Sequence, residues 1–212
     1  MQELSEIHAA HLGFSRSSLL ENGMMWVLYR LHVVMNEYPT YGDTLVETTW
    51  PCAIEGPVFP RHFRFNRPDG TQVGKAITAW VLIDLKTRRP LRPAALPGTI
   101  PPSELPPSLP MPGMLRIAGG TPLGSRTVLY SDLDINGHMN NTRYIDWVCD
   151  TLDLSALLSG TLKEFQINYI SEALPGERID LFAQTECNTT LTLGKRGDGR
   201  TVFEARTVLG DS

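Results

Sequence analysis

Short stretches in which apolar and polar residues alternate recur along this chain of 212 residues, and such alternation is typical of half-buried β-strands. In "RHFRFNR" (61–67) the phenylalanines are separated by polar side chains. An Asp-Gly pair follows this stretch, and another follows "TLTLGKR" (190–196). Glycine readily takes the positive φ that a tight turn needs. Since a further apolar stretch comes after each pair, over 72–84 and 200–209, the pattern predicts two β-hairpins.

The two predicted hairpins are similar in sequence. "RPDGTQVGKAIT" (67–78) and "RGDGRTVFEART" (196–207) align without a gap and share Arg67/Arg196, Asp69/Asp198, Gly70/Gly199, Val73/Val202, Ala76/Ala205 and Thr78/Thr207. The segments upstream, 36–50 and 171–185, are more loosely alike, because both run from a strand through proline, glycine and an acid into another strand. The shared order over both halves predicts a tandem repeat.

Each copy is expected to place one helix against an antiparallel sheet, which is an α+β arrangement. In the second copy the helix is predicted over about 139–154, where one face carries Tyr144, Trp147, Val148, Thr151 and Leu152 at i, i+3, i+4 spacing. A leading strand is expected before it, at "RTVLYS" (126–131). The first copy begins inside its helix, at "ELSEIHAAHLGF" (3–14). Either the true start lies upstream, or the first sheet lacks its leading strand.

A proline-rich segment separates the two copies. Residues 86–122 hold ten of the chain's 16 prolines. Proline lacks the backbone N–H and fixes φ, so this segment should be extended and outside any sheet. The predicted organisation is an N-terminal repeat over 1–85, a linker over 86–122 and a C-terminal repeat over 123–212.

The composition narrows the class of protein. A hydrophobic content of 42% with 20% charged residues is that of an ordinary globular protein, and a net charge of -4 argues against a nucleic-acid binder. Cys52, Cys149 and Cys187 lack metal-binding spacing and are expected to be free thiols. The start resembles neither a signal nor a transit peptide, and no apolar run is long enough to span a bilayer. We therefore expect a cytoplasmic protein.

Candidate chemistry gathers in "YSDLDINGHMNNTRYIDW" (130–147), which holds Asp134, Asn136, His138, Asn140 and Asn141. Turn and helix-capping preferences account for some of these polar residues, but not for the histidine or the asparagine pair. Together with the start of the helix they suggest a catalytic loop. Unpaired N–H groups at a helix N-terminus suit a developing oxyanion, and a histidine transfers protons near neutral pH. The loop itself holds no strong general base or nucleophile.

Two segments of the second copy, "DLDINGHMNNTRYIDW" (132–147) and "INYISEALPGE" (167–177), closely resemble the acyl-[acyl-carrier-protein] thioesterases. In the first copy, "WVLYRLHVVMNEYPTYGD" (26–43) and "AWVLIDLKTRRPLRP" (79–93) resemble the N-terminal repeat of the same family. The resemblance implies two tandem hot-dog folds, each a helix packed on a curved antiparallel sheet. It also implies that the C-terminal repeat is catalytic and that the N-terminal repeat mainly shapes the acyl pocket.

The resemblance also suggests roles for single residues. Asp134, Asn136 and His138 match the family's loop residues, and Glu172 matches its catalytic glutamate. Plant members have a cysteine directly after that glutamate, where this chain has Ala173, so a cysteine nucleophile at that position is excluded here. The expected reaction is attack by a water that Glu172 and His138 activate. Cys149 is the weaker alternative nucleophile, because it lies within the predicted helix beside core residues.

The expected substrate is a fatty acyl chain on acyl carrier protein, hydrolysed without a metal or cofactor. Substrate contacts are expected from Asn140, Asn141 and Trp26, and docking of the acidic carrier from Arg88 and Arg89. His8 and His11 have a spacing that can hold a metal, but the sequence offers no third ligand. Acyl-coenzyme A is an alternative substrate, and an acyl-binding or regulatory hot-dog protein is the alternative of another class. Pairing into a homodimer is left open.

Overall fold

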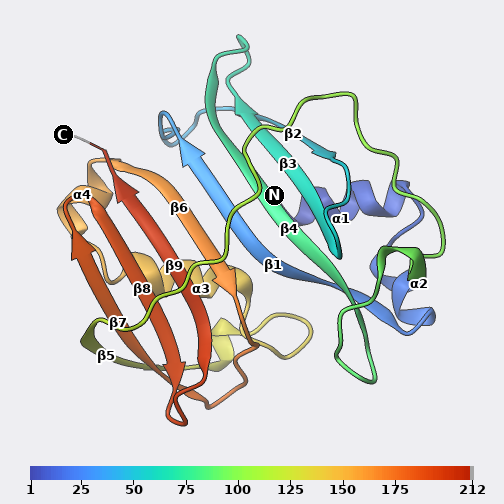
Figure 1. Cartoon of the computed structure of the whole chain (residues 1–212). Coiled ribbons are helices and arrows are strands. Elements are labelled where there is room, and N and C mark those ends of the chain that lie inside the picture. Colours follow the sequence, from blue (N-terminus) through green and yellow to red (C-terminus); the bar gives the residue numbers. More distant parts are fainter. Residues whose placement is uncertain (211–212) are drawn as a thin grey trace. The chain divides into compact units, whose positions relative to one another are not determined.

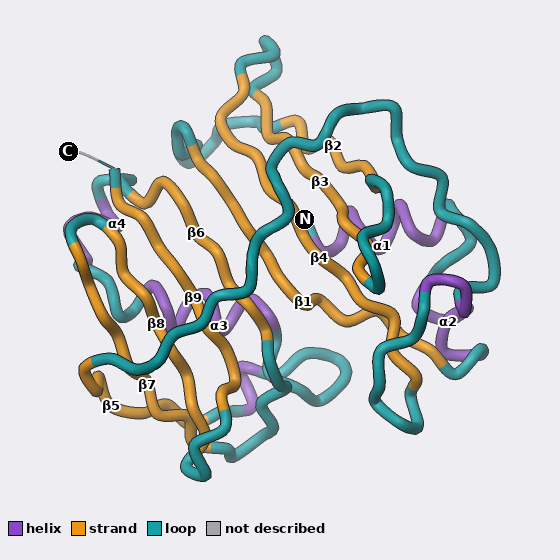
Figure 2. The backbone as a smooth tube through the Cα atoms, in the orientation of Figure 1, coloured by secondary structure: helices purple, strands orange, loops and turns teal. Residues whose placement is uncertain are grey.

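The computed structural model describes residues 1–210, which form two compact units. The first unit is Met1–Pro112, and the second begins at Gly113. Figures 1 and 2 show that each unit has one antiparallel sheet, with helix α1 against the first sheet and helix α3 against the second. The arrangement within each unit is the hot-dog type of α+β fold that the sequence predicts.

The first unit contains four strands in the spatial order β2-β3-β4-β1. Its elements are α1 (Gln2–His11), α2 (Arg16–Glu21), β1 (Met24–Met35), β2 (Val46–Pro51), β3 (Val58–Asn66), β4 (Gln72–Asp84) and the short 3-10 helix η1 (Pro93–Ala95). Helix α1 is joined to β3 by a hydrogen bond of 2.8 Å between His8 Nδ1 and Arg61 Nη1. Burial lowers the pKa of the Arg61 guanidinium to about 10.

Over its described residues, 113–210, the second unit contains five strands in the spatial order β6-β9-β8-β7-β5. Its elements are β5 (Thr121–Thr127), the 3-10 helix η2 (Tyr130–Asp132), α3 (Asn141–Cys149), α4 (Leu154–Leu158), β6 (Leu162–Tyr169), β7 (Arg178–Glu186), β8 (Thr189–Arg196) and β9 (Thr201–Leu209). Helix α3 packs on this sheet through Tyr144. Its ring makes edge contacts with Tyr169 of β6 and Phe203 of β9, with ring centroids 5.5 Å apart in both pairs.

The two predicted hairpins are present, and equivalent backbone hydrogen bonds occur in the turn of each. At the turn between β3 and β4, Gly70 has φ +92 and its N–H donates to the carbonyl of Arg67, while the Arg67 N–H donates to the carbonyl of Thr71. At the turn between β8 and β9, Gly199 has φ +84 and donates to Arg196, while Arg196 donates to Arg200. The tandem repeat read from the sequence is therefore also a repeat of backbone geometry.

In each hairpin a phenylalanine faces a glycine across the two strands, but the strand that carries the phenylalanine differs. Phe65 of β3 faces Gly74 of β4, whereas Gly194 of β8 faces Phe203 of β9. A Cβ atom at Gly194 would overlap the ring of Phe203. Since interiors are close-packed, each hairpin has room for only one large side chain at this register.

Two sequence predictions in the second unit were wrong in detail. The leading strand was expected over 126–131, but β5 covers Thr121–Thr127. All residues of β5 are exposed, and among the described residues it pairs only with β7, so it is an edge strand without apolar alternation. The helix expected over 139–154 is split, because α3 ends at Cys149 and α4 begins at Leu154.

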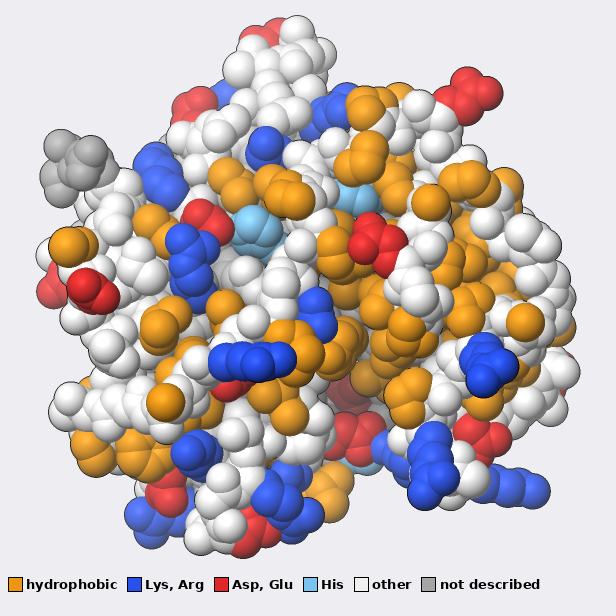
Figure 3. Space-filling view, in the orientation of Figure 1, with side chains coloured by type: hydrophobic (Ala, Val, Ile, Leu, Met, Phe, Trp, Pro, Cys, Tyr) orange, Lys and Arg blue, Asp and Glu red, His pale blue; other side chains and the backbone are white. Residues whose placement is uncertain are grey.

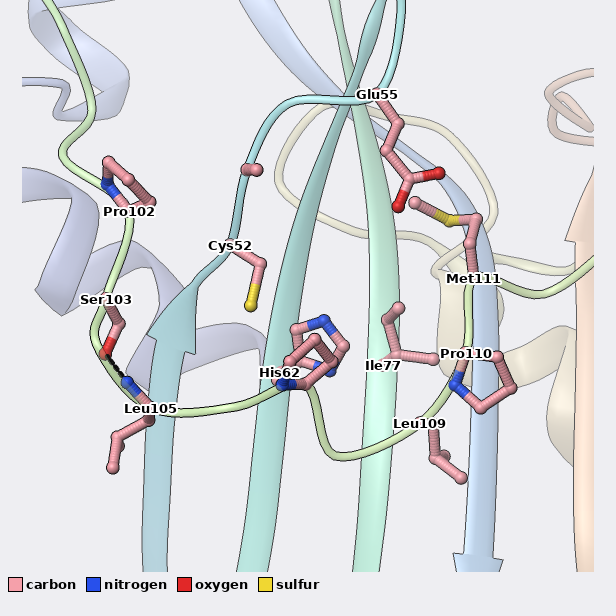
Figure 4. A pocket seen from close by; sticks show the side chains of 12 residues that line it. Cys52, Glu55, His62, Ile77, Pro102, Ser103, Leu105, Leu109, Pro110 and Met111 are labelled. Atoms are coloured by element: carbon pink, nitrogen blue, oxygen red, sulfur yellow. Dashed lines mark hydrogen bonds between the residues drawn. The ribbon is translucent and has the colours of Figure 1, made fainter.

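The proline-rich segment packs against the first unit. Among the described residues no strand is assigned between Asp84 and Thr121, and η1 is the only helical turn there. Leu96 joins the buried cluster of Phe14, Leu19, Met24, Phe59 and Leu82. Several side chains of residues 102–111 line one side of an open pocket of about 340 Å³ over β3 and β4, with His62 on its wall (Figure 4). The segment is thus part of the first unit's packing up to Pro112.

Two further features bear on the sequence predictions. Cys52, Cys149 and Cys187 are all free thiols, as expected. No helix in residues 1–210 has both the length and the apolar character that crossing a bilayer requires.

Candidate active site

Asp134 organises the loop that precedes α3. Its Oδ1 accepts the backbone N–H of Asn136 at 2.8 Å and that of His138 at 3.3 Å. Its Oδ2 accepts the Asn136 side-chain amide at 3.1 Å, and its own N–H donates to the His138 carbonyl at 2.8 Å. Gly137 completes the turn with φ +75. One carboxylate therefore sets the conformation of the segment that carries both Asn136 and His138.

Asn140 is the N-cap of α3. Its side-chain oxygen accepts the backbone N–H and the hydroxyl of Thr142, both at 3.0 Å. The next residue, Asn141, is held through its carbonyl, which accepts the Tyr169 hydroxyl at 3.1 Å. Burial raises the pKa of that tyrosine, so it stays a neutral donor. These contacts give both asparagines a structural role, and their expected contacts with substrate stay predictions.

Glu172 lies in the segment between β6 and β7, and this segment is tied to α3 and its entry loop. The N–H of Ala173 donates to the Tyr144 hydroxyl at 3.0 Å, and the carbonyl of Ala173 accepts the N–H of Met139 at 3.0 Å. Burial raises the pKa of Tyr144 to about 12. The residue after Glu172 is therefore bonded to the residue after His138 and to the buried face of the helix.

These contacts bring His138 and Glu172 face to face. His138 Nε2 lies 3.7 Å from Glu172 Oε2, and the two side chains are 26% and 38% exposed. An imidazole beside a partly accessible carboxylate can take a proton from water and return it to a leaving group. The structure thus places Asp134, Asn136, His138 and Glu172 in one unit, with the first amide groups of α3 beside the loop.

The other residues singled out from the sequence lie elsewhere. Cys149 is the last residue of α3, and burial, with Asp146 and Asp150 nearby, raises the pKa of its thiol, which disfavours the nucleophilic thiolate. Trp26 of β1 is in the first unit, packed edge-on against Phe59 at 4.8 Å. Arg88 and Arg89 lie on the exposed loop after β4, also in the first unit.

Sequence reasoning missed the residues that hold the Glu172 segment. Tyr144 was expected only as a core residue of the helix, and Arg196 only as part of a turn. Arg196 donates to both carboxylate oxygens of Glu177, at 3.1 and 3.2 Å, and to the Ser171 hydroxyl at 2.8 Å. Burial tends to raise the pKa of Glu177, but the hydrogen bonds from Arg196 and Leu174 outweigh it and lower that pKa. The signal that could have found Arg196 was its identity with Arg67 in the repeat.

Comparison with known proteins assigns the chain to a family. The model of the acyl-ACP thioesterase C-terminal domain matches residues 124–207, which include all four site residues, and that of the N-terminal domain matches residues 1–94. The chain belongs to the acyl-ACP thioesterase family. The crystal structure of an acyl-ACP thioesterase from Bacteroides thetaiotaomicron is 26% identical, with a TM-score of 0.90 over 98% of this chain and 85% of that one.

Plant proteins of the acyl-ACP thioesterase family also match this chain. The chloroplastic oleoyl-acyl carrier protein thioesterase of Coriandrum sativum is 26% identical over 97% of this chain, which spans only 62% of that relative's length. The 12:0-ACP thioesterase from Umbellularia californica is 24% identical, with a TM-score of 0.78 over 98% of this chain and 86% of that one, and shows the shared fold.

Proposed function

We propose that this protein hydrolyses the thioester of fatty acyl-[acyl-carrier-protein] and releases the free fatty acid. The observation that carries the proposal is the His138–Glu172 pair, 3.7 Å apart at the entry to α3. Family membership supports the reaction class, and the relative of known structure that is 26% identical is named as an acyl-ACP thioesterase. A non-catalytic acyl-binding protein, the alternative, would have no need of a histidine paired with a carboxylate in one site.

The proposed chemistry is direct attack by water. The His138–Glu172 pair takes one proton from the water as its oxygen bonds to the carbonyl carbon, and the carbonyl electrons move onto oxygen. The resulting oxyanion is stabilised by the Asn136 amide and by N–H groups at the start of α3. When the intermediate collapses, the C–S bond breaks with its electrons on sulfur, and the pair returns the proton to that sulfur. The products are a carboxylic acid and the carrier thiol.

Asp134 is proposed to act on the loop and not on the substrate. All its observed partners are loop groups, namely the N–H groups of Asn136 and His138 and the Asn136 amide. A carboxylate that accepts several N–H bonds fixes a loop in one conformation. This role keeps Asn136 directed at the carbonyl while His138 faces Glu172.

The acidic carrier is proposed to dock on the first unit. Figure 3 shows Lys and Arg side chains gathered over the loop after β4. Lys86, Arg88, Arg89 and Arg92 are all exposed there, although the chain as a whole carries a net charge of -4. A local basic patch steers an acidic partner by charge complementarity. Trp26, in the same unit, is proposed to line the acyl pocket.

The decisive experiment compares three alanine variants, each first checked for folding. Thiol release from acyl-carrier-protein thioesters of increasing chain length should fall by about 10²-fold or more in His138→Ala and in Glu172→Ala. Cys149→Ala should keep wild-type turnover. Folded wild-type protein that turns over no thioester would leave the acyl-binding alternative. A preference for acyl-coenzyme A over the carrier would change the substrate but not the mechanism.

The remaining expectations about the whole protein stay proposals. The first unit is proposed to shape the acyl pocket and the second to hold the catalytic residues, with a cytoplasmic location. Whether the chain pairs into a homodimer is left open, and gel filtration with light scattering tests it directly.

A further inference from the structure

We propose that Arg196 is a positioning residue for Glu172, because its guanidinium holds the backbone of the segment that carries this glutamate. The inference rests on the proposed function, in which Glu172 helps to activate water. It concerns a residue outside the His138 loop, at the end of β8.

Arg196 gathers three parts of the segment between β6 and β7. Its Nε and Nη2 donate to the carboxylate of Glu177, its Nη1 donates to the Ser171 hydroxyl at 2.8 Å, and its Nη2 also donates to the carbonyl oxygen of Glu172. The Arg196 side chain is only 16% exposed. Charge-assisted bonds from a planar fork are strong and specific in direction, so the guanidinium fixes where this segment lies.

The contact with the Glu172 carbonyl completes a fixed peptide plane. The carbonyl of Glu172 and the N–H of Ala173 belong to the same planar unit, and the N–H donates to the Tyr144 hydroxyl at 3.0 Å. Arg196 therefore holds one edge of the plane and Tyr144 the other. A plane held at both edges sets the direction in which the Glu172 side chain leaves the backbone, and thereby its distance from His138.

The bonds from the hairpin arginine to the segment two strands before it are called the clamp here. The first repeat contains the same clamp, but without a catalytic residue. Arg67, which aligns with Arg196, donates to Glu37 at 2.6 Å and to Asp43 at 3.3 Å. Both partners lie in the segment after β1, which corresponds to the segment after β6. The clamp is thus a device of the repeat that ties this segment to the hairpin. Only in the second repeat is a donor of this arginine bonded to the backbone of a proposed catalytic residue.

The pair of arginines supplies a matched control. Arg67→Met and Arg196→Met each remove one clamp, and both should lower Tm. Only Arg196→Met should also lower kcat, by about tenfold to a hundredfold with KM little changed, because a small displacement of a catalytic group slows the chemical step. Arg196→Lys keeps a charge for Glu177 but not the planar fork, so it should recover Tm more fully than kcat.

A double-mutant cycle separates positioning from general stability. In the Glu172→Ala background Arg196→Met should cost little further activity, because the group that it positions is already gone. The same fold-loss in both backgrounds would overturn the proposal, as would a kcat in Arg196→Met no lower than in Arg67→Met. If Arg196→Met does not fold, Arg196→Lys against Arg67→Lys carries the same comparison, and equal kcat values reject the proposal. Full activity in Glu172→Ala itself would instead reject the proposed function.

Discussion

The backbone N–H of Met139 donates a hydrogen bond to the carbonyl oxygen of Ala173 over 3.0 Å. These two residues directly follow His138 and Glu172 in the sequence. The bond joins two segments more than thirty residues apart and leaves the two ionisable side chains 3.7 Å from each other. The backbone, as well as the side chains, therefore places His138 opposite Glu172.

Tyr144→Phe is predicted to impair the site while leaving the helix in place. The substitution removes the acceptor of the buried Ala173 N–H, and leaving such a group unpaired costs about 1–3 kcal/mol of stability. We also expect a lower kcat, because one edge of the Glu172–Ala173 peptide plane is released. Chemical denaturation and thiol release measure the two effects. Tyr130→Phe is the control, since Tyr130 is 92% exposed, and equal kcat in the two variants would contradict the prediction.

Asp134→Asn is predicted to disrupt the loop although it changes few atoms. The new amide nitrogen in place of Oδ2 would face the Asn136 side-chain amide, so that two donors meet where a donor met an acceptor. The loss of this bond should lower kcat by about ten- to a hundredfold, with KM less affected.

Asp146→Asn is the matched control for this change. Asp146 is an exposed residue of α3 that pairs with Arg143 on the helix surface at 2.8 Å, and such pairs contribute little. Wild-type turnover in Asp134→Asn would show that the loop does not depend on this carboxylate.

The sequence allowed the repeat and the two hairpins to be predicted, because both depend on local rules. Asp134, Asn136 and His138 stand out in a dense polar motif, whereas Glu172 was suggested only by the family resemblance, and the catalytic roles of all four stay predictions. Asp-Gly turns and alternating phenylalanines identify hairpins without reference to the rest of the chain. The clamp at Arg196 was not predicted, since its partners Ser171 and Glu177 lie in another segment and meet it only in the folded unit. Strand β5 was misplaced because an exposed edge strand carries no apolar pattern.

Gly194→Ala is predicted to destabilise the second unit and to affect the site through packing. A Cβ atom there would overlap Phe203, which is fully buried and packs its ring against Tyr144. Overpacking of this kind costs about 1–3 kcal/mol. Gly197→Ala is the control, because no atom beyond its neighbours in the chain lies within 4 Å of its Cβ position. The free energy of unfolding from urea titrations should fall in the first variant only, and an equal change in both would refute the packing argument.

His62 is predicted to make the first unit less stable in mild acid. Its side chain is 2% exposed, its Nδ1 accepts the Ser108 N–H at 3.1 Å, and it borders a cavity also lined by Cys52 and Glu55 (Figure 4). Burial lowers the pKa of His62 from 6.5 to about 4. Between these two values the unfolded chain binds a proton that the folded chain does not. The resulting stability is therefore complete above pH 6.5 and is lost as the pH falls toward 4.

The effect is measurable by comparing wild type with His62→Gln, which removes the titrating group and keeps a polar side chain. From about pH 7 to about pH 5 the unfolding free energy of wild type should fall by about 2 kcal/mol more than that of the variant. His8, whose pKa is also lowered, chiefly by burial, contributes equally to both proteins and cancels in the difference. Parallel pH profiles would mean that His62 takes up its proton without unfolding the unit, and that the cavity beside it admits the charged form.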